Sequence, residues 1–303
     1  MKVALLAGGL GGSRFARALT ETLDPRDVTI VGNVGDDLEV SGLYVSPDLD
    51  TILYTLAGVL DEEKGWGRAG ETWNARDAAT EAGAETWFQL GDRDLGLHLA
   101  RTEALNRGEP LSAVTARLAQ SFGVEASLLP ATDDRLRTWI ATSAGELSFQ
   151  EWFVRRRHED EVDGVRFEGA DDARAAPGVL EAFEAADLIA IAPSNPFVSI
   201  GPILAVAEIR EALAARRAPA VAVSPLIGGR TVRGPADRML ARLKGGTGPA
   251  QVTDCYKGLI DALVVDEADA DEDAGIPTIV TRTLMSDEDA RRRLVEAVLG
   301  VPV

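Results

Sequence analysis

Short apolar runs recur along the chain, and most are followed by a loop rich in Gly, Pro, Ser or Asp. The runs lie at residues 3–7, 28–31, 188–192, 220–223, 262–265 and 278–281. Stretches with helical periodicity, such as residues 13–23 and 203–215, separate them. A strand covered by helices on both faces reads as an uninterrupted apolar run. The alternation therefore predicts an α/β fold with a doubly wound, mainly parallel, Rossmann-like sheet.

The middle of the chain has a different composition. Residues 61–160 contain all five tryptophans, which are Trp66, Trp73, Trp87, Trp139 and Trp152. Helical patterns lie near residues 72–82, 95–107 and 111–121, and residues 138–142 and 146–152 are typical of a hairpin. We therefore predict a mainly helical inserted subdomain over residues 61–164, with a small β element. Residues 1–60 and 165–303 would form the Rossmann-like nucleotide-binding core.

Charge and cysteine content exclude several classes of protein. The chain has 31 Lys and Arg against 49 Asp and Glu, a net charge of −18. Such a field repels nucleic acid and anionic membranes. The single cysteine, Cys255, excludes an internal disulfide and a multi-thiolate zinc site. No apolar run is long enough to span a bilayer, and the first run is too short for a signal peptide. We expect a cytoplasmic enzyme with neither nucleic acid nor membrane as partner.

Four glycines follow the first apolar run directly. They are Gly8, Gly9, Gly11 and Gly12, and a helical stretch begins after them. Glycines let a ligand approach the backbone, and a helix N-terminus offers free N–H groups to phosphate. We predict a phosphate-binding loop here, with a tight structural turn as the alternative. The Gly-Lys-Ser/Thr ending of a Walker A loop is missing, and Arg14 stands at the third glycine of a dinucleotide fingerprint.

Four aspartates come after the second apolar run. Asp36 and Asp37 lie in the segment NVGDD, and Asp48 and Asp50 lie in SPDLDT. Clustered carboxylates with only oxygen ligands around them suit Mg²⁺, which also accepts substrate phosphates. We predict Asp36, Asp37 and Asp50 as metal ligands. The alternatives are turn formation by the first pair and helix capping by the second.

Other polar residues stand beside predicted strands or helices. The candidates for ligand contact are Asn33, Arg93, Asp94, Ser194, Asn195, Ser224 and Gly228. Ordinary proline turns are the alternative for the later segments, and helix capping is the alternative for Asp94. His98 is equally compatible with a helix surface and with a ligand contact. Residues 155–157 and the acidic residues 266–273 are expected to be solvated.

Taken together, these motifs resemble the 2-phospho-L-lactate transferase (CofD/FbiA) family of coenzyme F420 biosynthesis. The matching segments are GGLGGSRF, NVGDDLEVSG, SPDLDTILYTLAG, GWGRAGETW, LGDRDLGLHL, LLPATDD, SFQEWFVR, APSNPFVSIGPIL and SPLIGG. They lie between residues 7 and 235, and the order of SPDLDT, LGDRD and PSNP is highly specific. Beyond residue 240 the match is only architectural.

The resemblance implies a phosphotransferase that acts on substituted phosphate groups and needs Mg²⁺. A guanosine-diphosphate-activated donor would supply a phospholactyl or phosphoenolpyruvyl group. The acceptor would be the ribityl hydroxyl of Fo (7,8-didemethyl-8-hydroxy-5-deazariboflavin), and the products F420-0, or its dehydro form, and GMP. The segments around GWG, ETW and FQEW look most like actinobacterial-type members, so we expect the enolpyruvyl donor.

Motif by motif, the resemblance also implies roles for residues. Asp50 and Arg93 resemble acceptor-site residues, and the inserted subdomain would contribute to that site. Asp36, Asp37 and Asp48 resemble neighbours of the metal and of the reacting phosphate. The glycine loop and the segments at Ser194 and Ser224 resemble nucleotide and phosphate contacts. An aspartate could take the proton of the acceptor hydroxyl; Asp50 is the first candidate, and Asp48 is also proposed as catalytic.

Two other classes of protein remain as alternatives. A non-catalytic nucleotide- or deazaflavin-binding protein is disfavoured, because clustered carboxylates repel a phosphate unless a metal is present. An NAD-dependent oxidoreductase is disfavoured because the second strand ends in Gly32-Asn33, without an acidic residue for a ribose. The expected partners are small molecules, and a homodimer is left open.

Overall fold

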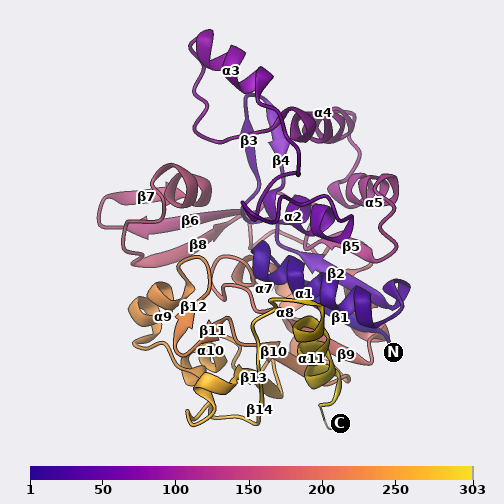
Figure 1. Cartoon of the computed structure of the whole chain (residues 1–303), viewed down its shortest axis with the longest axis vertical. Helices are drawn as coiled ribbons and strands as arrows, with labels where there is room; N and C mark the ends of the chain where they lie inside the picture. The colour runs from indigo at the N-terminus through magenta and orange to yellow at the C-terminus, as the bar shows by residue number, and fades with distance from the viewer. Residues whose placement is uncertain (302–303) are drawn as a thin grey trace.

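The computed structural model describes residues 1–301, and a seven-stranded parallel sheet forms its centre (Figure 1). The strand order is β14-β13-β10-β9-β1-β2-β5. The strands are β1 Val3–Ala7, β2 Val28–Gly32, β5 Ser127–Pro130, β9 Leu188–Ile191, β10 Ala220–Val223, β13 Ala262–Asp266 and β14 Thr278–Thr281. The chain builds outward from β1 to β5, returns to β9 and then builds in the opposite direction. This confirms the predicted doubly wound sheet and places its switch point between β1 and β9.

The apolar runs became the inner strands because both faces of the sheet are covered. Every residue of β1, β9, β10 and β13 is buried. The edge strand β14 instead alternates between exposed and half-buried residues, as expected where one side lacks a neighbour. The buried strands fix the positions of the loops that leave their carboxyl ends.

Helices flank the sheet. They are α1 Gly9–Thr22, α2 Pro47–Leu56, α3 Asn74–Glu81, α4 Asp92–Asn106, α5 Leu111–Ser121, α6 Val179–Ala185, α7 Gly201–Ala205, α8 Ala207–Ala214, α9 Ala236–Lys244, α10 Pro249–Cys255 and α11 Glu288–Leu299. Short 3₁₀ turns, η1 Pro25–Asp27 and η3 Glu267–Asp269, and a π-helical turn, η2 Glu151–Arg155, complete them. Helix α1 packs against both α2 and α11, so the two ends of the chain meet there (Figure 1). Within residues 1–301, no helix is long and apolar enough to cross a bilayer.

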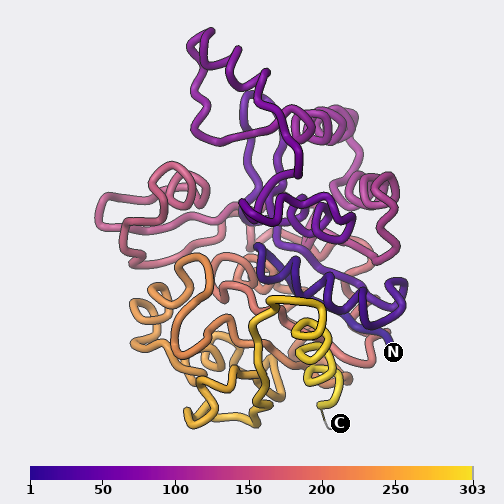
Figure 2. The backbone as a smooth tube through the Cα atoms, in the orientation of Figure 1, coloured from indigo at the N-terminus to yellow at the C-terminus, as the bar shows by residue number. Residues whose placement is uncertain are grey.

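The middle segment leaves the core after α2 and returns at β5. Figure 2 shows it running out to α3, far from the sheet, and coming back through α4 and α5. Strand β5 pairs with β2, so residues 61–164 contribute one strand to the central sheet, which we did not predict. The predicted hairpin exists as β6 Arg137–Thr142 and β7 Gly145–Ser148, and β8 Gly164–Glu168 extends it to three strands.

Several local expectations need correction. Helix α1 begins at Gly9, so the glycines form its first turn instead of a loop before it. The helix expected at residues 203–215 is divided into α7 and α8. Ser46, not Asp50, is the N-cap residue of α2. Two small hairpins were not predicted: β3 Leu38–Val40 with β4 Leu43–Val45, and β11 Leu226–Ile227 with β12 Arg230–Thr231.

The first turn of α1 approaches the loop after β9 too closely to admit a side chain. A Cβ atom on Gly11 would lie 2.5 Å from the backbone oxygen of Pro193. We expect Gly11→Ala to lower the free energy of unfolding by about 1–3 kcal/mol, the usual cost of overpacking. Gly96, inside α4, has open space around its Cβ position. Gly96→Ala is the matched control and should raise stability by up to about 1 kcal/mol. Urea denaturation measures both, and equal effects would contradict this account.

Candidate active site

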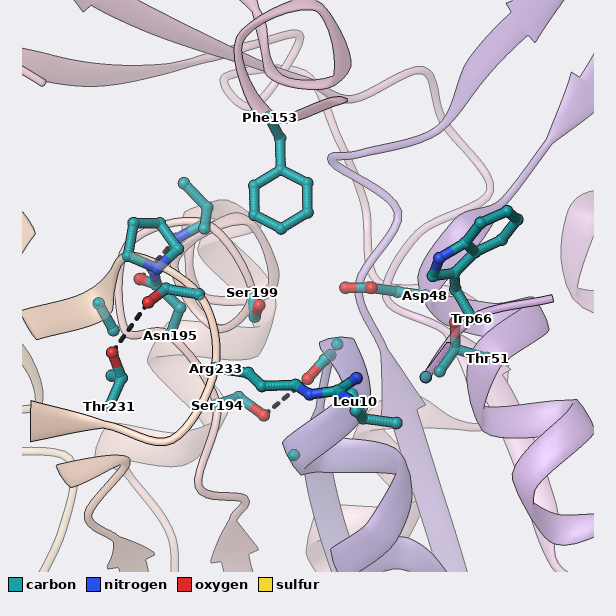
Figure 3. A pocket seen from close by; sticks show the side chains of 18 of the residues that line it. Leu10, Asp48, Thr51, Trp66, Phe153, Ser194, Asn195, Ser199, Thr231 and Arg233 are labelled. Atoms are coloured by element: carbon teal, nitrogen blue, oxygen red, sulfur yellow. Dashed lines mark hydrogen bonds between the residues drawn. The ribbon is translucent and has the colours of Figure 1, made fainter. Parts of the chain in front are cut away.

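A cavity of about 890 Å³ opens at the carboxyl ends of the strands on both sides of the switch point (Figure 3). Ligands of doubly wound sheets bind at this place. Three loops form its floor. They contribute Gly8, Gly9, Leu10 and Gly11 after β1, Pro193, Ser194 and Asn195 after β9, and Ser224 and Pro225 after β10.

The N-terminus of α1 forms the centre of this floor. Its N-cap residue, Gly8, has no side chain to bond the first-turn N–H groups, which suits them to an anionic ligand. Gly8 is also tightly packed, because a Cβ there would lie 2.6 Å from Asp48 Oδ2 and 2.9 Å from Ser199 Cβ. Gly12 does not line the cavity; its Cβ position points at Ser194 Oγ and Ala7.

Asp36 and Asp48 are buried side by side at the edge of the cavity. Asn33 is also buried, but it does not line the cavity. Its Nδ2 donates to Asp48 Oδ2 (2.9 Å) and to the Val198 carbonyl (3.1 Å). Burial raises the pKa of both carboxyl groups, and the neighbouring Asp48 raises that of Asp36 further. Asp36 Oδ1 is buried with no hydrogen-bond partner. The negative charge of the ionised pair is therefore poorly compensated by the protein.

The other two aspartates of the predicted cluster face away from the cavity. Asp37 Oδ2 accepts hydrogen bonds from Tyr44 Oη and Ser46 Oγ, both at 2.9 Å, and burial raises the pKa of Asp37 to about 7. Asp50 forms a buried two-point ion pair with Arg101 of α4. Across residues 1–301, no three His, Cys, Asp or Glu side chains come close enough together to hold a metal ion. The predicted ligand set of Asp36, Asp37 and Asp50 is thus not assembled.

The pair of Asp36 and Asp48 nevertheless fits Mg²⁺. This ion is usually held by one or two protein carboxylates, with water and substrate phosphates completing its shell. A cation here would relieve the repulsion between the two carboxylates and would give Asp36 Oδ1 a partner. A magnesium site would therefore be formed by Asp36 and Asp48, and would be completed by the substrate.

His98 and Arg101 lie on α4, where both are close to Asp50. His98 is buried, so a helix-surface position is wrong, and burial is the main reason that its pKa falls to about 4. His98 Nδ1 lies 3.8 Å from Asp50 Oδ2 and 3.3 Å from Arg101 Nη1. The sequence offered no sign of the Arg101 contact, because its partner is 51 residues away.

Arg93 and Asp94 lie at the start of α4 and do not line the cavity. Arg93 is exposed, and its Nη1 donates to the Ala69 carbonyl at 3.3 Å. Glu71 accepts the backbone N–H groups of both residues, so Glu71 and not Asp94 caps the helix. Asp94 is buried, and burial raises its pKa to about 6.

Of the remaining candidates, Ser194, Asn195 and Ser224 line the cavity. Ser194 Oγ donates to the Gly8 carbonyl at 2.8 Å and joins the loops after β1 and β9. Asn195 Oδ1 and Ser224 Oγ accept N–H groups of their own turns, from Phe197 and Leu226. Gly228 lies outside the lining, and its N–H donates to Asp269.

Sequence reasoning missed much of the cavity wall. Phe153 points into the cavity (Figure 3) and stacks on Phe149 and His158, with ring centroids 5.1 Å apart in each pair. Arg155 and Arg157 are exposed, as expected, yet they line the cavity mouth. Of the tryptophans, Trp66 and Trp87 line it. Arg233 donates to the Lys64 carbonyl at 3.0 Å and connects the two sides of the mouth.

The ion pair between Asp50 and Arg101 makes a clear prediction about stability. Removing one partner leaves the other charge buried and uncompensated, so Asp50→Ala should lower the free energy of unfolding by about 3–5 kcal/mol. The double variant Asp50→Ala/Arg101→Met should regain most of this loss. Asp289→Ala, which breaks an exposed pair with Arg292, is the control and should cost less than about 1 kcal/mol. A double variant no more stable than the single one would refute the role given to the pair.

Comparison with known proteins identifies the family of the chain. Residues 3–293 match the family model of the 2-phospho-L-lactate transferase CofD. The chain is 44% identical to the phosphoenolpyruvate transferase of Streptomyces coelicolor, over 99% of this chain and 97% of the relative. Its identity to the enzyme of the same name from Mycolicibacterium smegmatis is 39%, over 99% and 98% of the two chains.

Solved structures support the fold. Protein BH3568 from Bacillus halodurans superposes with a TM-score of 0.67 at 18% identity, over 98% of this chain and 99% of that one. At this identity the likeness concerns the fold alone. The family model and the relatives extend over nearly the whole chain, and they establish that it belongs to the CofD family of 2-phospho-L-lactate transferases.

Proposed function

We propose that the protein transfers a phosphoenolpyruvyl group from a guanosine-diphosphate-activated donor to the ribityl hydroxyl of Fo, with Mg²⁺, in coenzyme F420 biosynthesis. The products would be dehydro-F420-0 and GMP. The observation that carries the proposal is the position of Asp36 and Asp48 beside the N-terminus of α1, where both line the cavity. A helix N-terminus next to a carboxylate pair suits a phosphate that arrives with a metal ion.

The reaction would need positioning and charge stabilisation more than covalent chemistry. The acceptor oxygen forms a bond to the distal phosphorus of the donor, and the bond from that phosphorus to the bridging oxygen breaks. GMP leaves with the bonding electrons. Bound Mg²⁺ would neutralise charge on the phosphate oxygens. Asp36 and Asp48 would hold the ion, the N–H groups of α1 would orient the phosphate, and the hydroxyl proton would pass to this carboxylate pair.

The choice of donor rests on the relatives. Those from Streptomyces, Thermobifida and Mycolicibacterium at 39–44% identity carry the name phosphoenolpyruvate transferase. The lactyl and enolpyruvyl donors differ by two hydrogens, and pockets separate such apolar differences by only about 1–3 kcal/mol. We therefore expect a preference for the enolpyruvyl donor and not an absolute selection.

A competition between donors tests the proposal. The protein is incubated with Fo, Mg²⁺ and equal concentrations of both donors, and mass spectrometry quantifies GMP and the two phosphodiesters. We expect the enolpyruvyl product to dominate by roughly 10-fold, and chelation of Mg²⁺ to stop the reaction. An excess of the lactyl product would overturn the choice of donor. Absence of both products would overturn the transferase proposal itself.

The carboxylate pair makes a second prediction. Asp48→Asn keeps the shape of the side chain but removes its charge, so we expect turnover to fall by about 10²-fold or more. The loss should be partly offset by a large excess of Mg²⁺ if the substrate can still bring the ion in. Asp171→Asn, on an exposed residue outside the cavity, is the matched control and should be unaffected. Turnover of Asp48→Asn near that of the control would remove Asp48 from the reaction.

A further inference from the structure

The acidic stretch after β13 is not simply solvated, because two of its carboxylates are buried and saturated with hydrogen bonds. Asp269, 2% exposed, accepts the N–H groups of Gly228 (3.0 Å) and Gly229 (2.9 Å). Asp266 accepts Thr283 N at 2.8 Å and Thr283 Oγ1 at 3.1 Å on one oxygen, and Ala268 N at 3.0 Å on the other. The expectation that residues 266–273 are solvated is therefore wrong for these two.

Asp269 holds a turn that needs such support. Gly228 and Gly229 connect β11 to β12, and their φ angles of +58° and +69° are those of a two-residue hairpin turn with both residues left-handed. Both N–H groups of this turn point to the same side, where the Asp269 carboxylate meets them. The sequence predicts Gly228 as a ligand contact, but a carboxylate of the protein accepts its N–H group.

The segments held by the two aspartates form one wall of the cavity. The hairpin contributes Ile227, Thr231, Val232 and Arg233, and the residues at and after Thr283 contribute Leu284 and Met285. In Figure 3 Thr231 lies across the cavity from Asp48 and Trp66. We call this set the hairpin wall. Asp266 is the N-cap residue of η3 and Asp269 is its last residue, so this one turn connects the two parts of the hairpin wall.

The hairpin wall suits the donor better than the acceptor. Its residues in the described chain carry no carboxylate, whereas the opposite wall carries Asp36 and Asp48. A diphosphate ester is repelled by carboxylates and attracted by a guanidinium such as that of Arg233. Val232 and Leu284 remain 61% and 48% exposed, although both are large apolar residues. Such residues at a cavity rim are typical of a surface that covers the apolar faces of a nucleoside.

We propose that Asp269 and Asp266 are positioning residues that hold the hairpin wall in the shape required to bind the nucleoside-diphosphate donor. The inference rests on the function proposed above and assigns one wall of the same cavity to one of the two substrates. Neither carboxylate touches the donor. Each carboxylate acts through the backbone of a segment that contacts the donor. Loss of the carboxylate therefore changes the affinity for the donor and leaves the acceptor site intact.

Steady-state kinetics with the full-length chain test this. Asp269→Ala should raise the KM for the donor by about 10-fold or more, because the two N–H groups that fix the turn lose their partner. The KM for Fo should stay within about twofold. Asp269→Asn keeps one acceptor oxygen and should lie in between. Asp271→Asn, an exposed acid of the same stretch, is the control. Calorimetric titration with GDP and Mg²⁺ should show the same order of affinities without turnover.

The outcomes separate the two proposals. If the wild type binds GDP and Asp269→Ala binds it equally well, the positioning role is overturned while the proposed function stands. Equal increases in both KM values also overturn it, because they indicate a general loss of structure. If Asp269→Ala does not fold, the same comparison is made with Asp269→Asn. A wild-type chain that neither binds GDP nor forms product removes the proposed function, and this inference with it.

Discussion

Two buried carboxylates, Asp36 and Asp48, lie beside each other at the N-terminus of α1, and the chemistry proposed for the cavity depends on this contact. Taking two like charges out of water is unfavourable, and burial and mutual repulsion raise the pKa of Asp36 accordingly. The protein offsets part of the cost with the amide of Asn33 and the positive end of the helix. The charge that the protein leaves uncompensated can be balanced by a bound cation. We therefore expect the proposed Mg²⁺ and a phosphate to bind together, because each would make the binding of the other more favourable.

The chain has many acidic residues, and the fold treats them in different ways. Asp50 is neutralised by Arg101 inside the protein, and Asp266 and Asp269 are saturated by N–H and hydroxyl groups behind the hairpin wall. Among the Asp and Glu residues of the described part of the chain, only Asp36 and Asp48 border the cavity. This separation matters because the proposed donor is itself anionic. A wall without carboxylates would hold the diphosphate, and the opposite wall would hold the proposed Mg²⁺.

The sheet could be predicted from the sequence because its inner strands are buried on both faces. Residues 188–192 and 220–223 are apolar throughout. Such an uninterrupted run is typical of a strand that is covered on both faces of the sheet. Strand β5, Ser127–Pro130, was missed because its apolar run is only Leu128 and Leu129, between a serine and a proline. The hairpin β11–β12 was missed because each of its strands has two residues, too few for any periodicity. Elements this short leave no recognisable pattern in the local sequence.

The candidate site was predicted in outline, since loops after parallel strands converge at one edge of the sheet whatever their composition. The roles of individual residues were harder to predict, because they depend on partners distant in sequence. Asp50 is separated from Arg101 by 51 residues and Gly228 from Asp269 by 41, and neither contact leaves a local signal. A resemblance between motifs identifies which segments surround a site. It does not tell which carboxylate in a segment faces the ligand.

The central claim is that Asp36 and Asp48 form a carboxylate pair that requires a cation. NMR titration of ¹³C-labelled aspartate carboxyl carbons tests it directly, with Asp36→Asn and Asp48→Asn to assign the two signals. Without metal, both should titrate well above the ordinary aspartate pKa of about 3.9, and Mg²⁺ with GDP should lower both values. If both groups titrate near pH 4 and Mg²⁺ with GDP does not shift them, the two carboxylates do not interact as described and the account is wrong.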